Sequence, residues 1–476
     1  MRFFESCPHN YIKCKMFIAM TVKALPFFFV LFIIMSICLN ILIIYNRGDG
    51  EVSMFIHVVQ RGDVLWRIAD YYKADINSII EANALPDPGR LLVGQSLLIP
   101  TENNTYTVRA GDTAWKIAQS HGVTVQDLLW ENKILNPDNL YVGQELVIPV
   151  GPKPEIEVNA FTYILGQDAV PVVSEVGDLL TYLTPFAYLV QEDGSLVPID
   201  DEAAIGEAIA NGVVPMMSIV NFTVNTAGEN VANKVLNNPD VVNTLQDNII
   251  STMKDKGYQG LNIDFEYVLP EDREAYNNFI ESTVNRLHNE GFFVSTSLAP
   301  KLNADQRGLL YEAHDYPANG RIADFVVLMT YEWGWRGGQP RAISPINEIE
   351  RVLDYAVTVI PRNKILMGFQ IYARDWTLPF EPGQEAETIS IEEAMNRAYA
   401  HNAQIQYDYV AQSPYFRYTD GEGNAHEVWF EDARSAQAKF DAVKEYGLRG
   451  ISYWGLGYPF TQNWALLADN FDIKKL

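Results

Sequence analysis

The stretch Gly260-Leu261-Asn262-Ile263-Asp264-Phe265-Glu266 alternates apolar and polar side chains. This alternation predicts a β-strand that packs one face and presents the other, so Asn262, Asp264 and Glu266 share a face. Two carboxylates side by side repel each other, and the repulsion usually raises the pKa of one of them. A protonated Glu beside an ionised Asp suits acid-assisted cleavage of a glycosidic bond. An isolated pair of this kind would also fit an edge-strand charge pair without chemistry.

Beyond residue 155 the chain alternates strand-like apolar runs with amphipathic segments long enough for crossover helices. Eight such runs predict an α/β fold, a closed (β/α)8 TIM barrel over residues 155–470, with a hairpin inserted at 404–431. A doubly wound open sheet is the alternative, but no Gly-rich nucleotide-binding turn follows the first run. The runs are Asn159–Leu165, Tyr182–Tyr188, Val213–Val220, Gly260–Glu266, Phe293–Ser297, Phe325–Tyr331, Lys364–Phe369 and Gly450–Trp454.

Residues 55–100 and 105–149 repeat each other. Each copy predicts a small βααβ module in which Asp63 or Asp112 caps the first helix and a glycine turns the chain into the last strand. Trp66 and its counterpart Trp115 are interpreted as core residues at helical spacing in preference to sugar-stacking platforms. The pairs that carry the repeat are Gly62-Asp63 with Gly111-Asp112, Trp66 with Trp115, Asn83 with Asn132, and Val93-Gly94-Gln95 with Val142-Gly143-Gln144.

The N-terminal region carries a long apolar run. Leu25 to Tyr45 are uncharged and rich in Phe, Ile and Leu, which is enough for a helix to cross ~30 Å of hydrocarbon. Basic residues precede the run, so residues 1–50 are predicted to be a cytoplasmic lead-in and a transmembrane anchor (span 25–45), with the later domains outside. A cleaved signal peptide is the alternative, but the run does not end in small residues.

Charge and cysteine content exclude several function classes. The net charge of −25 falls mostly beyond residue 150, which argues against a nucleic-acid partner. All three cysteines precede residue 39, so the main body has no disulfide and no thiolate metal site. The seven histidines show no HExxH motif or paired spacing. We therefore expect no metal and no cofactor.

Chemistry-bearing residues recur where the predicted strands end. The candidates are Tyr188 on the second strand, Glu266 on the fourth, Tyr331-Glu332 on the sixth, Tyr372 on the seventh and Trp454 on the eighth. In a barrel of this type these ends meet on one face, where function is carried. Aromatic rings pack against sugar C–H groups and carboxylates bind hydroxyls or transfer protons, so this rim suits a sugar site.

The two repeats resemble LysM modules over their whole length, in HVVQRGDVLWRIA…LLVGQSLLIP and YTVRAGDTAWKIA…LYVGQELVIP. The resemblance implies binding to the N-acetylglucosamine-containing backbone of peptidoglycan or chitin.

The predicted barrel resembles glycoside hydrolase family 18. The family pattern DGxDxDxE appears as Gln259 to Glu266, and MxYD appears as Met329-Thr330-Tyr331-Glu332. An aromatic-rich seventh strand appears as Tyr372 with Asp375-Trp376, and the floor Trp of the eighth strand as Trp454. Together with the LysM modules, the chain resembles the spore cortex-lytic and spore-germination N-acetylglucosaminidases of endospore-forming bacteria.

This resemblance implies a retaining, substrate-assisted reaction. Glu266 would protonate the leaving oxygen and then activate water, while the substrate's own 2-acetamido oxygen closes an oxazolinium ring. Asp264 would bind the acetamido N–H, and Tyr331 would donate to the acetamido carbonyl. Trp454 would form the floor, and the further substrate-binding candidates are Tyr372, Asn262, Glu332 and Trp376.

The sequence departs from the family pattern at three positions. Gln259 and Asn262 replace the first two Asp residues, which predicts that Asp264 ionises more easily than it would beside an Asp. Glu332 replaces Asp and is expected to alter a neighbouring subsite. We expect a membrane-anchored glycosidase of the cell wall or spore envelope that acts on peptidoglycan. A non-catalytic wall-binding protein and a chitinase are the alternatives.

Overall fold

The computed structural model describes residues 53–102, 105–121, 123–149, 153–222 and 229–476. The segment predicted to cross a membrane, residues 25–45, lies outside these described residues. Within the described ranges, no helix combines the length and the apolar character that a bilayer span requires.

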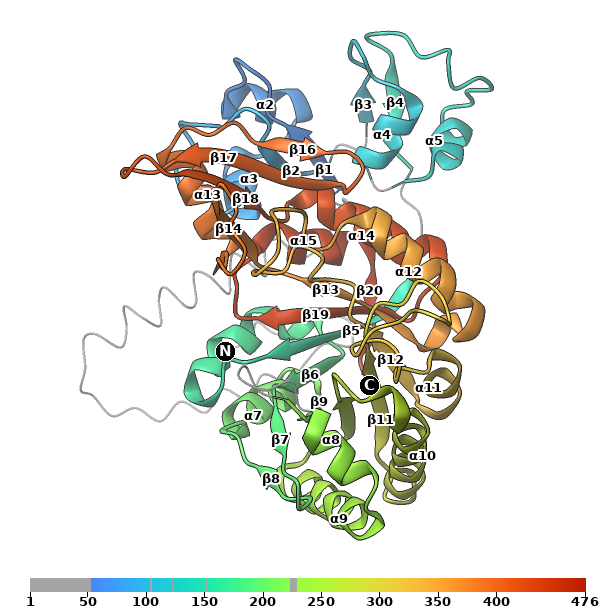
Figure 1. Ribbon diagram of the computed structural model, residues 1–476. Helices are drawn as coiled ribbons and strands as arrows, with labels where there is room; N and C mark the ends of the chain where they lie inside the picture. Colours follow the sequence, from blue (N-terminus) through green and yellow to red (C-terminus); the bar gives the residue numbers. More distant parts are fainter. Residues whose placement is uncertain (1–52, 103–104, 122, 150–152, 223–228) are drawn as a thin grey trace, which may run out of the picture. The chain divides into compact units, whose positions relative to one another are not determined.

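Eight parallel strands close into a ring (Figure 1). Each predicted run overlaps one strand of the ring, and the last strand pairs with the first, so the predicted barrel is confirmed and the open-sheet alternative is wrong. In order around the ring, the strands are β5 (Glu155–Thr162), β6 (Tyr182–Pro185), β9 (Val214–Val220), β10 (Gly260–Asp264), β11 (Phe293–Leu298), β12 (Phe325–Leu328), β13 (Ile365–Gln370) and β19 (Gly450–Leu456).

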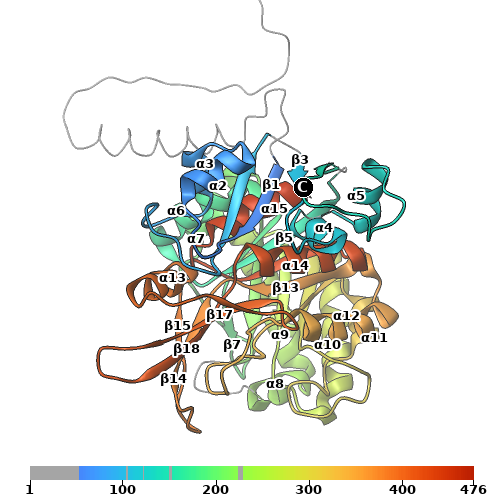
Figure 2. The same ribbon diagram turned by 90° about the horizontal axis from the view of Figure 1, so that it is seen from above.

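Helices connect these strands and cover the outside of the ring (Figures 1 and 2). Local sequence fixes their ends: α9 starts at Pro239 after the N-cap Asn238, whose side chain accepts from two backbone N–H groups, and stops at Gly257 with φ 83°. The helices are α6 (Ala169–Val176), α7 (Glu202–Ala210), α8 (Glu229–Leu236), α9 (Pro239–Lys256), α10 (Arg273–Asn289), α11 (Tyr316–Ile322), α12 (Ile346–Val359), α14 (Ala433–Tyr446) and α15 (Thr461–Asn470). The short strands β7 (Tyr188–Val190), β8 (Leu196–Val197) and β20 (Asp472–Ile473) add to the barrel sheet.

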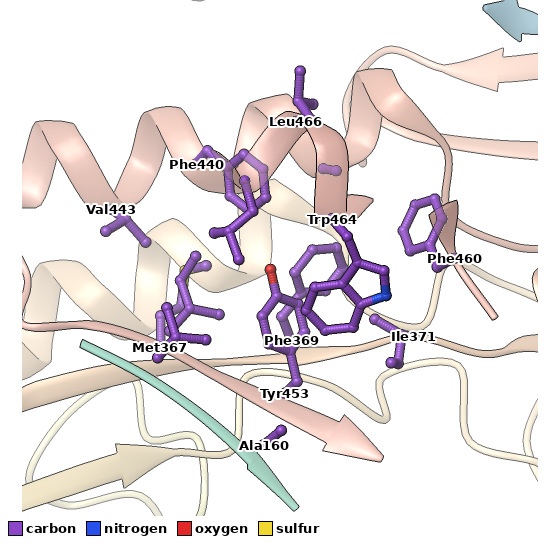
Figure 3. Close-up of a cluster of buried hydrophobic side chains, with 14 of the residues drawn as sticks. Ala160, Met367, Phe369, Ile371, Phe440, Val443, Tyr453, Phe460, Trp464 and Leu466 are labelled. Atoms are coloured by element: carbon purple, nitrogen blue, oxygen red, sulfur yellow. The ribbon is translucent and has the colours of Figure 1, made fainter. Parts of the chain in front are cut away.

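The core between strands and outer helices is continuous, and Figure 3 shows part of it. Tyr453 of β19 packs on Trp464 of α15 with ring centroids 4.8 Å apart, and Phe369 of β13 meets Phe440 of α14 at 6.5 Å. Burying a side chain of this size contributes about 1.5–3 kcal/mol. Because neighbouring side chains on a strand alternate, the outward position of Tyr453 turns Trp454 toward the ring interior.

The amino-terminal end of the ring is closed by an ionic cluster around the buried Glu157. Its carboxylate accepts hydrogen bonds from the Tyr182 hydroxyl (2.8 Å), Arg449 Nε (2.5 Å) and Lys474 Nζ (2.9 Å). Burial by itself raises the pKa of Glu157, but these hydrogen bonds and the Arg449 charge lower it overall. Paired side chains therefore fill the amino-terminal end of the barrel, and a ligand site is expected at the carboxyl-terminal end.

The insertion between β13 and β19 is larger than the hairpin predicted at 404–431. It is a five-stranded antiparallel sheet with one helix, α13 (Ile391–Ala400). Three of its strands fall within 404–431, and the predicted hairpin is formed by two of them. The first strand of the insertion begins at Ala373, just after the seventh barrel strand ends at Gln370, so the sequence pattern predicted a single seventh strand there. The strands are β14 (Ala373–Leu378), β15 (Glu387–Ile389), β16 (Gln406–Asp408), β17 (Ser413–Thr419) and β18 (Ala425–Trp429).

The two repeats fold as predicted, each with a pair of antiparallel strands and two helices between them. Module 1 consists of β1 (Ser53–Val58), α2 (Leu65–Tyr72), α3 (Ile76–Ala82) and β2 (Ser96–Thr101). Module 2 consists of β3 (Thr105–Thr107), α4 (Ala114–Ser120), α5 (Val125–Glu131) and β4 (Glu145–Val147).

The predicted helix caps in the modules are wrong. The Asp63 carboxylate accepts from the Gln60 backbone N–H (2.7 Å) and lies 3.0 Å from His57 Nε2. Asp112 repeats this arrangement with the Arg109 backbone N–H at 2.7 Å. Each Asp carboxylate therefore closes the turn between strand and helix. This local hydrogen bond competes with helix capping for the same side chain.

The interpretation of Trp66 and Trp115 as core residues is also wrong. Their side chains are 60% and 59% exposed. In module 1 the inward face of α2 is occupied by Leu65, Ile68 and Ala69, and a residue directly after Leu65 lies on another face of the helix. Both indoles are therefore available to a ligand.

Module 1 is joined to the barrel and its insertion through hydrogen bonds and a shared apolar core. The Ile405 backbone N–H donates to the Val93 carbonyl (3.0 Å), and the Arg90 guanidinium donates to the Tyr399 carbonyl (2.7 Å). Leu92 and Leu98 of the module belong to the same apolar core as the outer helices. The loop before β2 is thus fixed against the insertion.

Gly94 tests this contact, with Gly143 as its matched control. Both have positive φ, 85° and 88°, so alanine at either site costs about 1–2 kcal/mol for the backbone conformation. A Cβ on Gly94 would lie 1.9 Å from the Ile405 carbonyl oxygen, whereas one on Gly143 meets nothing within 4 Å. We expect Gly94→Ala to lower the free energy of unfolding by a further ~1–3 kcal/mol in denaturant titrations. Equal losses for the two variants would contradict the docking.

Candidate active site

The site lies where β10 leaves the ring. Leu261, Ile263 and Phe265 point outward into the core beneath the helices, and Phe265 stacks on Tyr276 with centroids 5.9 Å apart. The polar residues of the same stretch occupy the other face, as the alternation predicts. Asp264 and Glu266 therefore share the carboxyl-terminal face of the barrel.

Side chains from neighbouring elements hold the backbone at Glu266. Asn221, directly after β9, accepts from the Glu266 N–H (2.9 Å) and donates to the Glu266 carbonyl (2.7 Å). The buried His314 lies 2.9 Å from the Phe265 carbonyl, and burial lowers the pKa of His314 to about 4, so the ring is neutral. Sequence reasoning missed both residues, because nothing local links them to β10.

Burial shifts both carboxyl groups toward their protonated forms. It raises the pKa of Asp264, which the Ser297 hydroxyl partly offsets. Burial also raises the pKa of Glu266, and the negative charges of Asp264 and Glu332 add to the effect. Because two close carboxyls titrate as a pair, the pair retains a proton more readily than free acids do.

One carboxylate oxygen of this pair has no protein partner. Asp264 Oδ1 is buried and makes no hydrogen bond within the described structure. A buried acceptor left unpaired costs about 1–3 kcal/mol, so the site is prepared for a donor from a ligand.

Asn262 lies on the same face of β10 as the carboxyl pair and is hydrogen-bonded to two serines. Its amide donates to the Ser295 hydroxyl (3.0 Å) and accepts from the Ser297 hydroxyl (3.2 Å), and the residue is buried. Both polar atoms of the Asn262 side chain therefore already have protein partners, and its predicted contact with substrate stays a prediction. Its predicted effect on the ionisation of Asp264 stays a prediction.

Tyr331 follows β12 and faces the carboxyl pair. Burial first, and then the charges of Asp264, Glu266 and Glu332, raise its pKa well above the ordinary value, so its hydroxyl stays a donor. Gly368 makes room for the ring: a Cβ there would lie 2.8 Å from Tyr331 Cε1. Because Gly368 has no side chain, the Tyr331 ring can pack directly against strand β13.

Glu332 lies in a cluster with Tyr372 and Arg374. Its carboxylate accepts from the Tyr372 hydroxyl and from Arg374 Nη2 (2.6 Å). Arg374 is buried, and its Nε has no partner within the described structure. Sequence reasoning did not single out Arg374, since a lone arginine after a strand carries no motif.

Aromatic rings surround the partly exposed Trp454. The centroids of Phe186, Phe161 and Tyr163 lie 4.7, 5.8 and 6.4 Å from that of its indole. The edge-to-face contacts with Phe186 and Phe161 hold the planar indole rigidly in place. The structure thus brings Trp454, Tyr331, Tyr372 and Glu332 to the same end of the barrel as the carboxyl pair.

Two predicted rim residues lie elsewhere. Trp376 is 1% exposed, belongs to the insertion sheet, and donates its indole N–H to the Gly338 carbonyl (2.8 Å). Its indole is therefore packed inside the insertion, and its predicted contact with substrate stays a prediction. Tyr188 starts β7 and is buried against Tyr258, with its hydroxyl on Asp201.

Removing the Glu332 charge tests the electrostatics of the site. We expect Glu332→Gln to lower the pKa of Glu266, because it removes a negative charge that favours the protonated form, so the Glu266 proton is lost at lower pH. Carboxyl-carbon NMR titration measures this. Glu387→Gln is the control, since that carboxylate pairs with Arg397 (2.9 Å). An unchanged or raised pKa in Glu332→Gln would contradict the account.

Comparison with known proteins agrees with this geometry. Residues 223–458 match the model of glycosyl hydrolases family 18, and residues 57–100 and 106–149 each match the LysM domain. The cortical fragment-lytic enzyme of Bacillus subtilis is 50% identical over 429 residues, which cover 89% of this chain and 99% of that protein.

Solved structures give the same result. The spore cortex-lytic enzyme SleL of Bacillus cereus superposes with a TM-score of 0.83 at 40% identity, covering 89% of this chain and 99% of that one. A chitinase from Chromobacterium violaceum matches with a TM-score of 0.60 at 24% identity, over 66% of this chain and 98% of its own, which shows the shared fold alone. The chain is a glycosidase and belongs to glycosyl hydrolases family 18, with two LysM domains ahead of its catalytic barrel.

Proposed function

We propose that this glycosidase cleaves peptidoglycan strands after N-acetylglucosamine, and that its natural substrate is the peptidoglycan of the spore cortex. The observation that carries the proposal is the buried carboxyl pair of Asp264 and Glu266 beside a protonated Tyr331. The cortex is favoured because the cortical fragment-lytic and spore cortex-lytic relatives match over nearly their full length.

In the proposed reaction Glu266 is the general acid. It gives its proton to the glycosidic oxygen as that bond breaks, and the substrate's acetamido carbonyl oxygen attacks the anomeric carbon to close an oxazolinium ring. Glu266, now a carboxylate, takes a proton from the water that opens the ring. A general acid with a pKa near the working pH contributes typically 10²–10⁴-fold to such a reaction.

Asp264 and Tyr331 would hold the acetamido group. The unpaired Asp264 Oδ1 suits the acetamido N–H as a donor, and its negative charge would stabilise the oxazolinium cation. The Tyr331 hydroxyl would donate to the acetamido oxygen and fix its direction of attack. Substrates without the N-acetyl group would lack the internal nucleophile.

Trp454 would form the floor of the site, with Tyr372 and Glu332 at its edge. The indole is supported by Phe186 and Phe161 and is only partly buried, which leaves a face for the sugar. Glu332 is held by Arg374 and Tyr372, so it would present a fixed carboxylate to a neighbouring sugar.

The runner-up functions differ in what the site must do. A wall-binding protein without catalysis needs no protonated carboxyl, yet Glu266, Asp264 and Tyr331 are all present, and the charge of Asp264 helps to raise the pKa of both Glu266 and Tyr331. A chitinase would use the same residues, so only substrate comparison separates it. The LysM domains serve either polymer.

We also propose that residues 25–45 anchor the protein in a membrane, with the LysM domains and barrel on the wall side. The uncharged run and its basic flank support this. Detergent-dependent extraction from the membrane fraction is the expected behaviour, and release by alkaline carbonate would contradict it.

Glu266→Gln tests the function. We expect the full-length protein to release muropeptides with N-acetylglucosamine at the new reducing end from cortex peptidoglycan, detected by mass spectrometry. The variant should be at least about 10²-fold slower, because its amide cannot donate a proton to the glycosidic oxygen. Glu271→Gln, at an exposed position of the short 3₁₀ helix Pro270–Asp272, is the control. No cleavage of cortex or vegetative peptidoglycan, with wall binding intact, would favour the binding-protein alternative.

Asn221 tests the positioning of the acid. We expect Asn221→Ala to lower kcat roughly 10-fold or more while KM stays close to that of the parent, because two hydrogen bonds that fix the Glu266 backbone are lost. Asn211→Ala, which removes amide bonds to Glu207 outside the site, is the control for stability. A rise in KM alone would place Asn221 in substrate binding instead.

A further inference from the structure

The backbone that carries Tyr331 lies beyond the end of a barrel strand. The last residue of β12 paired with β13 is Leu328. The N–H groups of Thr330 and Tyr331 donate to the Leu328 and Met329 carbonyls (2.8 and 2.9 Å). Such local hydrogen bonds shape a turn, but they do not tie it to a neighbouring strand. The direction of the Tyr331 side chain therefore depends on contacts from other elements.

Two such contacts hold the residue before Tyr331. The Thr330 hydroxyl donates to the Gly368 carbonyl of β13 (2.7 Å). The Thr330 carbonyl, which belongs to the peptide group shared with Tyr331, accepts from the Ser344 hydroxyl (3.0 Å). Because a peptide group is planar, a fixed carbonyl also fixes the N–H and Cα of the residue that follows.

Gln370 and a buried ion pair extend this contact away from the site. The Ser344 hydroxyl also donates to Gln370 Oε1, and Gln370 Nε2 donates to Glu431 Oε1 (2.9 Å). The other oxygen of Glu431 accepts from Lys439 Nζ of α14 (2.8 Å). These four side chains are at most 1% exposed. The contacts therefore form one buried path from helix α14 to the peptide group of Tyr331.

The charge of Glu431 sets the orientation of the Gln370 amide. A carboxylate only accepts hydrogen bonds, so the NH₂ end of the amide must lie on its side. The carbonyl end then faces Ser344, whose one hydroxyl hydrogen is shared between Gln370 Oε1 and the Thr330 carbonyl. A buried carboxylate is costly unless it is paired, and Lys439 supplies the pair. A fully paired buried network restricts the movement of its members.

We propose that Gln370 and Ser344 are positioning residues that hold the Tyr331 hydroxyl in place for the reacting sugar. The pair of Glu431 and Lys439 keeps the Gln370 amide in the orientation that this requires. The inference rests on the proposed role of Tyr331 in the reaction, but the path of contacts itself does not. A displacement of about 1 Å in such a group can slow a reaction about 10²-fold, so a path remote from the sugar can affect the rate.

A double-mutant cycle with soluble N-acetylchitotetraose tests this role in the full-length protein. We expect Ser344→Ala to lower kcat roughly 3- to 10-fold and to leave KM within about 2-fold of the parent, because the sugar still binds while the hydroxyl is displaced. In a Tyr331→Phe background the same change should lower kcat less than about 2-fold, since the hydroxyl that it positions is gone.

Ser413→Ala is the matched control for this cycle. It removes another buried hydroxyl that donates to a backbone carbonyl, that of Ala411 (3.4 Å), and it should leave kcat unchanged. Equal losses from Ser344→Ala in the two backgrounds, or no loss in either, would overturn the proposal.

Gln370→Met gives a second variant, which removes both amide contacts at a similar side-chain volume. We expect a similar loss of kcat, and the double variant with Ser344→Ala should lose no more than about 2-fold beyond the larger single loss, because both changes break one path. Fully multiplicative losses would overturn the proposal.

NMR of the Tyr331 ring measures position without catalysis. The ring signals of the carbon-labelled full-length protein, assigned with Tyr331→Phe, should shift in Ser344→Ala and Gln370→Met and stay in place in Ser413→Ala. Unmoved signals in the first two variants would overturn the proposal. If the parent cleaves no sugar, or Tyr331→Phe keeps the full rate, the proposed function fails, whereas these ring signals still decide whether the path positions Tyr331.

Discussion

Everything at the active site depends on burying two carboxyl groups on one face of β10. In water Asp264 and Glu266 would both be ionised near neutrality; inside the ring, loss of hydration makes that costly and favours a shared proton. The surroundings maintain this condition. The network of Asn262 with Ser295 and Ser297 satisfies the polar atoms beneath, Asn221 fixes the backbone, and Phe265 anchors the other face in the core.

The same logic extends to the neighbouring residues. Tyr331 remains a donor because it is buried beside negative charge, and Gly368 leaves the space its ring needs. Glu332 adopts a φ of 67°, a left-handed conformation that costs a non-glycine residue about 1 kcal/mol or more, and Arg374 and Tyr372 hold its carboxylate there. Asp264 Oδ1 and Arg374 Nε at this end have no hydrogen-bond partner within the described structure, whereas both oxygens of the Glu157 carboxylate at the other end are paired.

Sequence alone predicted what periodicity and motifs encode, and missed what depends on distant partners. The eight strand runs and the shared face of Asp264 and Glu266 follow from alternation within a few residues. The support of Glu266 by Asn221 and of Phe265 by His314, and the cluster of Arg374 with Glu332, join segments far apart in the chain. Trp376 and Trp66 differ from expectation in opposite directions. Trp376, beside a motif, is buried, and Trp66, at helical spacing, is exposed to solvent. Burial depends on which face of the element meets the core, and the local sequence does not give that face.

The central claim is that the substrate's acetamido group, and no second protein carboxylate, attacks the anomeric carbon. Proton NMR of the first product formed from a soluble N-acetylchito-oligosaccharide, beside its de-N-acetylated form, measures this most directly. Attack from within the sugar followed by water gives two inversions; a protein carboxylate would give the same two inversions but would not need the acetamido group. The account predicts that the new reducing end first appears as the β-anomer, before mutarotation, and that an otherwise identical de-N-acetylated oligosaccharide is not cleaved. An initial α-anomer, or cleavage of the de-N-acetylated sugar at a similar rate, would contradict it.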